Sequence, residues 1–246
     1  MLFTTPEGFR INYWFNKIKG KPFIVFLHGL AGDYTEFTHQ INALKKNYSI
    51  LAFDMLGHGK SDKPKNAKYY RSGYGIKLIL DFLKKEKIIN PIIIGFSMGG
   101  FLACKISEKI KVKKLILINP AFGVKSISLF FLISEFFSRF APKFILKLFV
   151  KSYNIYEYYG LLDEYAKMLL QTPEYVHKAI IENARAEIIP RVSQKAYVIK
   201  SRQDEIVNNY LPLKNYELFA LNGFHLVHVQ HYKEVNELIK KILIND

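Results

Sequence analysis

Residues 91–110, PIIIGFSMGGFLACKISEKI, place Ser97 between a short apolar run and a segment with helical character. The run predicts a buried strand and the segment from Met98 onward predicts a helix, so Ser97 lies at a strand-to-helix turn. Gly95 and Gly99 remove side chains that would collide across so sharp a turn. A serine held there projects its hydroxyl beside a helix N-terminus, where free N–H groups favour developing negative charge. The stretch therefore predicts a nucleophilic Ser97, and an ordinary glycine–serine turn is the alternative.

A second glycine-flanked motif follows an earlier apolar run. FIVFL at 23–27 predicts a strand buried on both faces, and HGLAG at 28–32 comes directly after it. Acyl transfer needs a second N–H donor near the nucleophile to hold the oxyanion. We expect the backbone N–H groups of Leu30 and Met98 to form this oxyanion hole. We interpret His28 as a hydrogen-bonding brace of the loop rather than as a catalyst.

Strand and helix patterns alternate through most of the remaining chain. Strands are expected at 2–4, 10–15, 23–27, 49–54, 92–95, 114–119, 196–200 and 216–221, and helices at 34–45, 70–87, 98–110 and 232–244. Strands separated by helices of this length predict a parallel sheet with right-handed crossovers. Only helical segments are expected between about 122 and 190. We therefore expect a single domain, residues 1–246, with a helical cap inserted at 122–190.

Three motifs in this order and spacing resemble the α/β-hydrolase superfamily: HGLAG at 28–32, FDMLGHGKSDKP at 53–64 and GFSMGG at 95–100. The likeness covers essentially the whole chain outside the cap and is closest to small capped esterases, lipases and C–C hydrolases. It implies an α/β fold with a mostly parallel eight-stranded sheet flanked by helices, and a cap inserted after the sixth strand. It also implies the chain order serine, acid, histidine. The family's counterpart of the 53–64 loop is structural, so its aspartate and histidine are not catalytic candidates.

The resemblance points to the catalytic acid in the loop after the strand at 196–200. The sequence SRQDEIV at 201–207 matches the family's acid loop and places Asp204 at the acid position. Ser201 stands where the family has glycine, so the local turn is expected to differ. Glu205 is the poorer candidate for the same role. The acid orients a neutral imidazole and stabilises the imidazolium that forms during the reaction.

The base is expected near the C-terminus, where LNGFHL at 221–226 matches the family's histidine loop and gives His225. His228 and His231 follow at spacing three, which raises the alternative of a metal site. Neither a cysteine nor a nearby carboxylate completes a ligand set there. We therefore expect a catalytic Ser97–Asp204–His225 triad with no metal and no cofactor.

Composition narrows the class of protein. The chain has 246 residues, half of them hydrophobic, which excludes a largely disordered chain. Its lone Cys104 excludes an internal disulfide and is interpreted as a small buried hydrophobe. The net charge is +15, but the lysines are scattered and no nucleic-acid motif accompanies them, so no nucleic-acid partner is expected. Neither a signal peptide nor an uninterrupted apolar span of membrane length is found, which predicts a soluble cytoplasmic protein.

The predicted cap has a distinctive composition. Residues 122–151 contain eight phenylalanines, which favour an acyl-binding pocket wall; a helix pair that packs its own small core is the alternative. Lys143, Lys147 and Lys151 share one helical face and could give the cap a weak contact with anionic surfaces.

The resemblance implies a serine hydrolase that cleaves carboxylic esters with short-to-medium apolar acyl chains through an acyl-enzyme intermediate. A serine at the nucleophile position disfavours the epoxide-hydrolase and dehalogenase branches of the superfamily. A thioesterase, a monoacylglycerol lipase, a C–C bond hydrolase and a cofactor-free haloperoxidase-like enzyme are alternatives on the same triad. A non-catalytic small-molecule receptor is an alternative of another class. The sequence assigns neither a natural substrate nor an oligomeric state.

Overall fold

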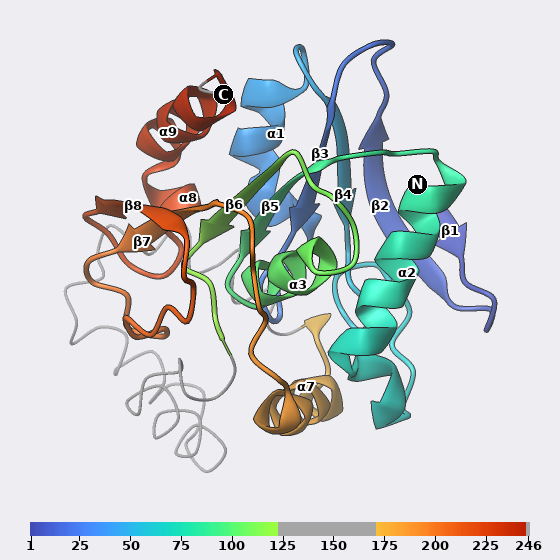
Figure 1. Cartoon of the computed structure of the whole chain (residues 1–246). Coiled ribbons are helices and arrows are strands. Elements are labelled where there is room, and N and C mark those ends of the chain that lie inside the picture. Colours follow the sequence, from blue (N-terminus) through green and yellow to red (C-terminus); the bar gives the residue numbers. More distant parts are fainter. Residues whose placement is uncertain (123–170, 245–246) are drawn as a thin grey trace.

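A mixed eight-stranded sheet forms the centre of the computed structural model, which describes residues 1–122 and 171–244 (Figure 1). The strands are β1 (Leu2–Thr4), β2 (Arg10–Asn16), β3 (Phe23–Leu27), β4 (Ser49–Phe53), β5 (Ile92–Phe96), β6 (Lys114–Ile118), β7 (Ala196–Ser201) and β8 (Tyr216–Leu221). Their spatial order is β1-β2-β4-β3-β5-β6-β7-β8. The β1–β2 and β2–β4 pairs are antiparallel and the other pairs are parallel. The carboxyl ends of β3 to β8 therefore share one edge, where α/β sheets place their ligands.

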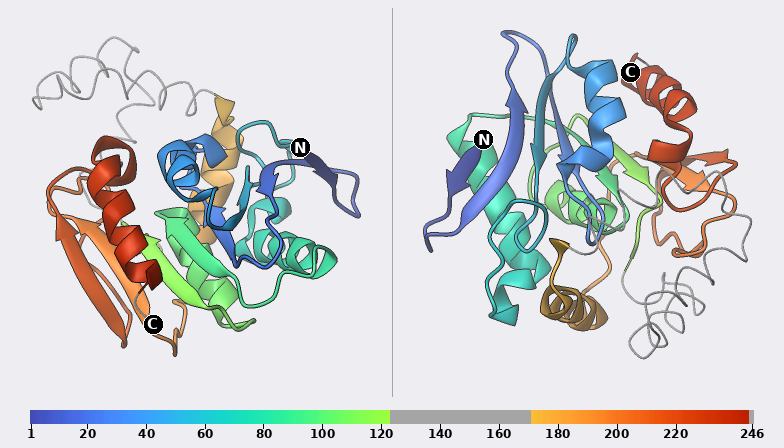
Figure 2. Two further views of the ribbon diagram at one scale, coloured as in Figure 1. Left: turned by 90° about the horizontal axis from the view of Figure 1, so that it is seen from above. Right: turned by 180° about the vertical axis from the view of Figure 1, so that it is seen from behind.

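The helices of the described residues connect and cover these strands. They are η1 (Tyr34–Phe37, a 3₁₀ turn), α1 (Thr38–Leu44), η2 (Ala67–Tyr70, a second 3₁₀ turn), α2 (Ser72–Lys85), α3 (Met98–Ser107), α7 (Glu174–Ala186), α8 (Val227–Gln230) and α9 (Tyr232–Ile244). Helices α1 and α9 lie side by side, as the view from behind in Figure 2 shows. Helices α2 and α3 contact each other. Their buried residues belong to one hydrophobic cluster, whereas those of α1 and α9 belong to a second cluster.

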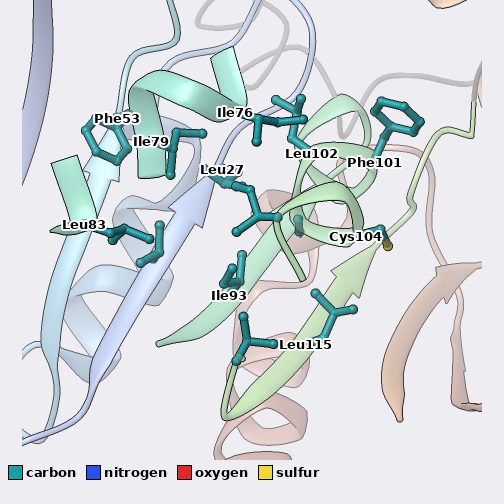
Figure 3. Close-up of a cluster of buried hydrophobic side chains, with 14 of the residues drawn as sticks. Leu27, Phe53, Ile76, Ile79, Leu83, Ile93, Phe101, Leu102, Cys104 and Leu115 are labelled. Carbon is teal, nitrogen blue, oxygen red and sulfur yellow. The ribbon is translucent and has the colours of Figure 1, made fainter. Parts of the chain in front are cut away.

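The alternation of strand residues divides the core between the two faces of the sheet. One cluster packs Leu27, Phe53 and Ile93 against α2 and α3, as Figure 3 shows. The neighbouring strand residues Phe26 and Ile94 point to the other face, where they pack with residues of α1 and α9. Burial on both faces is the reason that these strands read as continuous apolar runs.

The predicted strands are confirmed, each to within one residue at either end. The helix expected at 34–45 begins instead as the 3₁₀ turn η1, whose N-cap Asp33 accepts the N–H of Thr35 through its side chain, and continues as α1. The short helix α8 was not expected. Among the described residues, no helix is both long enough and apolar enough to cross a membrane.

The predicted cap at 122–190 falls largely on residues 123–170, which lie outside the described residues, as do Lys143, Lys147 and Lys151. Helix α7 belongs to the described part of this segment. Its Val176 and Ala179 form a small buried cluster with Tyr70 of η2. The hydroxyl of Tyr175 donates to the backbone oxygen of Lys63 at 2.6 Å. This end of the segment is thus anchored on the loop that follows β4.

Candidate active site

Ser97 occupies the sharp turn between β5 and α3. It is the N-cap of α3, with φ 50° and ψ −116°, a conformation that is strained for a residue other than glycine. A β-carbon at Gly95 would collide with the backbone carbonyl of Gly99, and one at Gly99 would collide with that of Leu27. The two glycines are therefore required by backbone packing. Ser97 itself is 8% exposed.

The HGLAG loop lies against this turn. A β-carbon at Gly29 would lie 3.4 Å from Cβ of Ser97 and still closer to the ring of Phe96. The loop passes through Ala31, whose φ is 65°. Within the described ranges, the N–H groups of Leu30 and Met98 donate to no backbone carbonyl. Both predicted oxyanion donors thus belong to segments that meet at Ser97.

Two buried side chains brace the HGLAG loop. Nε2 of His28 accepts the N–H of Met55 at 2.8 Å, and its Nδ1 lies 2.7 Å from the oxygen of Gly29. Burial lowers the pKa of His28, which keeps the ring neutral for this role. Oε2 of Glu36 accepts the N–H of Gly29 at 3.1 Å. The interpretation of His28 as a brace is confirmed, whereas Glu36 was not anticipated from the sequence.

Asp204 and His225 form a direct pair at the carboxyl edge of the sheet. Nδ1 of His225 lies 2.9 Å from Oδ1 of Asp204, and the two side chains are 3% and 2% exposed. The imidazole ring also packs on Phe96, the residue before Ser97, with 4.8 Å between ring centroids. The structure therefore brings the predicted acid and base together beside the turn that carries the predicted nucleophile.

Asp204 lies in an environment that favours its ionised form. Burial alone would raise the pKa of its carboxyl group. The charge and hydrogen bond of His225, the ammonium of Lys200 and the N–H of Val207 outweigh burial and lower the pKa to about 2. Asp204 is thus an anion at neutral pH, as an acid that orients an imidazole must be.

Asn119 and Ser201 attach the His225 loop to the sheet. Asn119, with φ 41°, follows β6, and its Nδ2 donates to Oγ of Ser201 and to the backbone oxygen of His225, both at 2.8 Å. Its Oδ1 accepts the N–H of Ser201 at 2.8 Å, and the hydroxyl of Ser201 donates to the oxygen of Phe224 at 2.7 Å. The serine that replaces the family's glycine thus links two loops of the site.

The other candidates take structural positions. The carboxylate of Glu205 accepts the backbone N–H of His225 at 3.2 Å. His228 is fully buried, and its ring packs on that of Phe96 with 4.2 Å between the ring centroids. The described residues contain no group of three or more side chains arranged to hold a metal ion. Cys104 is buried, as expected.

Asp54, in the loop after β4, is also structural. Its carboxylate is 1% exposed and accepts the N–H groups of Tyr34 and Lys60 and the side-chain amide of Asn12. It therefore fastens η1, β2 and its own loop together, which agrees with the role that the family resemblance implied.

The sequence matches the family model described as alpha/beta hydrolase fold over residues 22–156. Because this match covers more than half of the chain, the protein belongs to the α/β-hydrolase fold family. Epoxide hydrolase 4 of Mus musculus is 32% identical over 115 residues, which are 46% of this chain and 32% of that protein. A protein of Mycoplasma genitalium whose name places it among esterases and lipases is 32% identical over 109 residues, 43% of this chain and 40% of that protein.

The curated relatives are matched over only part of their length, between 32% and 40% for the four named first. Among solved structures, an esterase from Exiguobacterium antarcticum superposes with a TM-score of 0.79 at 19% identity, covering 99% of both chains. At that identity the superposition establishes the α/β-hydrolase fold. Family and fold together place this protein among the α/β-hydrolase-fold proteins, and the names of its matched relatives cover both esterases and epoxide hydrolases.

Proposed function

We propose that this protein is a serine hydrolase that cleaves carboxylic esters through an acyl-enzyme intermediate. Ser97 is the nucleophile, His225 the general base and acid, and Asp204 the residue that orients His225. The backbone N–H groups of Leu30 and Met98 form the oxyanion hole. The reaction needs no metal and no cofactor.

The proposed chemistry has two halves. His225 takes the proton of the Ser97 hydroxyl as its oxygen attacks the acyl carbon, and the tetrahedral oxyanion is held by the two N–H groups. The carbon–oxygen bond to the alcohol then breaks, and His225 gives its proton to the departing alcohol. In the second half His225 activates a water molecule that attacks the acyl carbon, and Ser97 leaves with the proton.

The observation that carries this proposal is the buried Asp204–His225 pair. A carboxylate held 2.9 Å from Nδ1 fixes the tautomer that leaves Nε2 free to accept a proton. The His225 ring also contacts Phe96, the neighbour of Ser97 in the chain. The strained φ of Ser97 is typical of a serine nucleophile at a strand-to-helix turn.

Epoxide hydrolysis is the second candidate, since the matched mouse protein is named for it. The residue at the turn argues against it. A carboxylate nucleophile that opens an epoxide forms an ester, which water then cleaves, whereas Ser97 would form an ether that water does not readily cleave. Attack by Ser97 on an acyl carbon instead forms an ester that can turn over. The nucleophile therefore favours ester substrates.

A fluorophosphonate probe and a panel of p-nitrophenyl esters, acyl thioesters and a styrene-type epoxide test the proposal. The wild-type protein is expected to be labelled at Ser97 and to hydrolyse esters faster than the epoxide. Ser97→Ala, which removes the hydroxyl and little packing, is expected to abolish both labelling and ester turnover while the protein stays folded. Unchanged turnover in Ser97→Ala, or turnover of the epoxide alone, would refute it.

A further inference from the structure

Lys200, in β7, places a buried ammonium group beside the carboxylate that pairs with His225. Its Nζ donates to Oδ2 of Asp204 at 2.9 Å and to the backbone oxygen of Val207 at 2.7 Å. The side chains of Lys200 and Asp204 are 6% and 2% exposed. A lysine is rarely buried unless it is paired, and this pair is shielded from water and salt.

We propose that Lys200 is a positioning residue for the triad: it fixes the Asp204 carboxylate and offsets part of its charge, so that the site stays active to lower pH than it would without this lysine. This inference rests on the proposed function, because it assigns a role within that same site. It concerns a residue outside the triad and the oxyanion hole.

The hydrogen bonds divide the two oxygens of Asp204 between different tasks. Oδ2 accepts Lys200, whereas Oδ1 accepts the N–H groups of Ile206 and Val207 and lies against Nδ1 of His225. A carboxylate held on both sides cannot rotate to present Oδ2 to the ring. Lys200 thus helps to keep Oδ1 in line with the imidazole.

The charges around His225 give Lys200 its second effect. Among the described residues, Asp204 and Glu205 are the acidic groups that bind His225, the first at the ring and the second at the backbone N–H. From α8, His228 adds no charge near neutral pH, because burial lowers its pKa to about 3. From the end of β6, Asn119 offers only a neutral amide. Lys200 is the positive group that opposes Asp204.

The size of the effect follows from Coulomb's law. A unit charge on the far side of a single carboxylate, at an effective dielectric constant of about 20, shifts a titration by on the order of one to two pH units. Relaxation of the protein and partial hydration reduce this shift, so we expect about one pH unit. The direction is fixed: removing the positive charge stabilises the imidazolium and moves the acid limb of the activity profile to higher pH.

The test is the rate of fluorophosphonate labelling at Ser97 as a function of pH, which needs no knowledge of the natural substrate. Lys200→Met is expected to move the acid-side midpoint upward by about one pH unit. Lys114→Met is the matched control, because Lys114 is 7% exposed and binds the backbone oxygen of Ile242. This variant also removes a buried positive charge, but from the amino-terminal end of β6, at the edge of the sheet opposite to the site. Its midpoint is expected to equal that of the wild type.

Two further variants separate charge from packing. Lys200→Arg keeps the positive charge and is expected to keep the wild-type midpoint. Lys200→Gln, a neutral donor, is expected to shift the midpoint as Lys200→Met does, and it carries the test if the methionine variant does not fold. A wild-type midpoint in the neutral variants, or an equal shift in Lys200→Arg, would overturn the role of Lys200. No labelling of Ser97 in the wild type would instead overturn the proposed function.

Discussion

Adjacent carboxylates after β7 show how single residues divide the work of the site. Asp204 faces the imidazole ring of His225, whereas Glu205 faces the backbone N–H of the same residue. A carboxylate that accepts the Nδ1–H orients the tautomer of the ring and stabilises the imidazolium. The two residues therefore differ in function although they are neighbours in sequence.

Asp204→Asn is expected to lower turnover of a p-nitrophenyl ester by about 10⁴-fold, because a neutral amide holds the wrong tautomer. Glu205→Gln is expected to lower it less than about tenfold, since glutamine keeps an oxygen that can accept the backbone N–H of His225. Thermal unfolding is the control, because Asp204→Asn leaves the ammonium of Lys200 buried without its counter-ion. The reverse ranking of the two folded variants would assign the acid role to Glu205.

The buried carboxyl group of Glu36 affects how the stability of the protein depends on pH. It is 3% exposed beneath the HGLAG loop. Burial raises the pKa of its carboxyl group from 4.5 to about 8, although the N–H of Gly29 opposes the rise. A group whose pKa is raised by folding contributes stability that is full below its unfolded pKa and is lost as the pH rises through the folded pKa.

The free energy of unfolding is therefore expected to contain a component that falls between about pH 5 and pH 8, by roughly 3 kcal/mol. Glu36→Gln stays neutral and is expected to lack this component, as urea titrations at several pH values would reveal. Glu237→Gln, on the exposed face of α9, is the matched control and should follow the wild-type curve. Parallel curves for the wild type and Glu36→Gln would show that Glu36 is ionised in the folded protein.

At the scale of elements, the turn between β5 and α3 depends on close backbone packing. A β-carbon at Gly95 or Gly99 meets backbone atoms rather than the end of a flexible side chain. The β-carbon at Gly95 would meet the first turn of α3, and the one at Gly99 would meet the end of β3 and the backbone of His28. Neither segment can move aside without displacing the turn that carries Ser97 or the HGLAG loop.

Gly95→Ala and Gly99→Ala are each expected to destabilise the protein by at least about 3 kcal/mol or to prevent folding, because overpacking cannot be relieved there. Gly73→Ala is the control, since a β-carbon at Gly73 in α2 meets nothing within 4 Å. That change is expected to be neutral or to stabilise by up to about 1 kcal/mol. Soluble expression and urea unfolding compare Gly95→Ala and Gly99→Ala with Gly73→Ala. A wild-type stability for Gly99→Ala would contradict this explanation of the turn.

The same scale explains what the sequence could predict. The central strands β3 to β6 were predictable because burial on both faces leaves continuous apolar runs, and Ser97 because its turn needs glycines at fixed spacing. Asp204 and His225 were found only through the family resemblance. The Asn119–Ser201 link joins residues 82 positions apart, so no local pattern indicates it. Lys200 did leave a local signal, a lysine at the end of a buried strand four residues before the acid.

At the scale of the whole molecule, the sheet gathers its loops at one edge and α7 fixes one end of the predicted cap to that region. The contacts of α7 with Tyr70 and Lys63 show where residues 174–186 sit. The remainder of the cap prediction, including its role as an acyl-binding wall, stays a prediction. Its eight phenylalanines would favour apolar acyl groups.

The rate of ester hydrolysis is expected to rise with acyl length from acetate through short-to-medium chains and then to level off. Each buried methylene contributes up to about 0.8 kcal/mol, or roughly threefold in kcat/KM, until the pocket is full. A series of p-nitrophenyl esters of graded length measures this profile. A flat profile from acetate onward would instead favour a cap whose phenylalanines pack only against each other.

The most direct test of the central claim is to trap the acyl-enzyme. A reaction with p-nitrophenyl butyrate is quenched with acid within the first turnovers, and the digested protein is mapped by mass spectrometry. We expect a butyryl group on the peptide that contains Ser97, and we expect it to be absent from Ser97→Ala. Ester turnover with no acyl group at Ser97, or with the acyl group on another side chain, would contradict it.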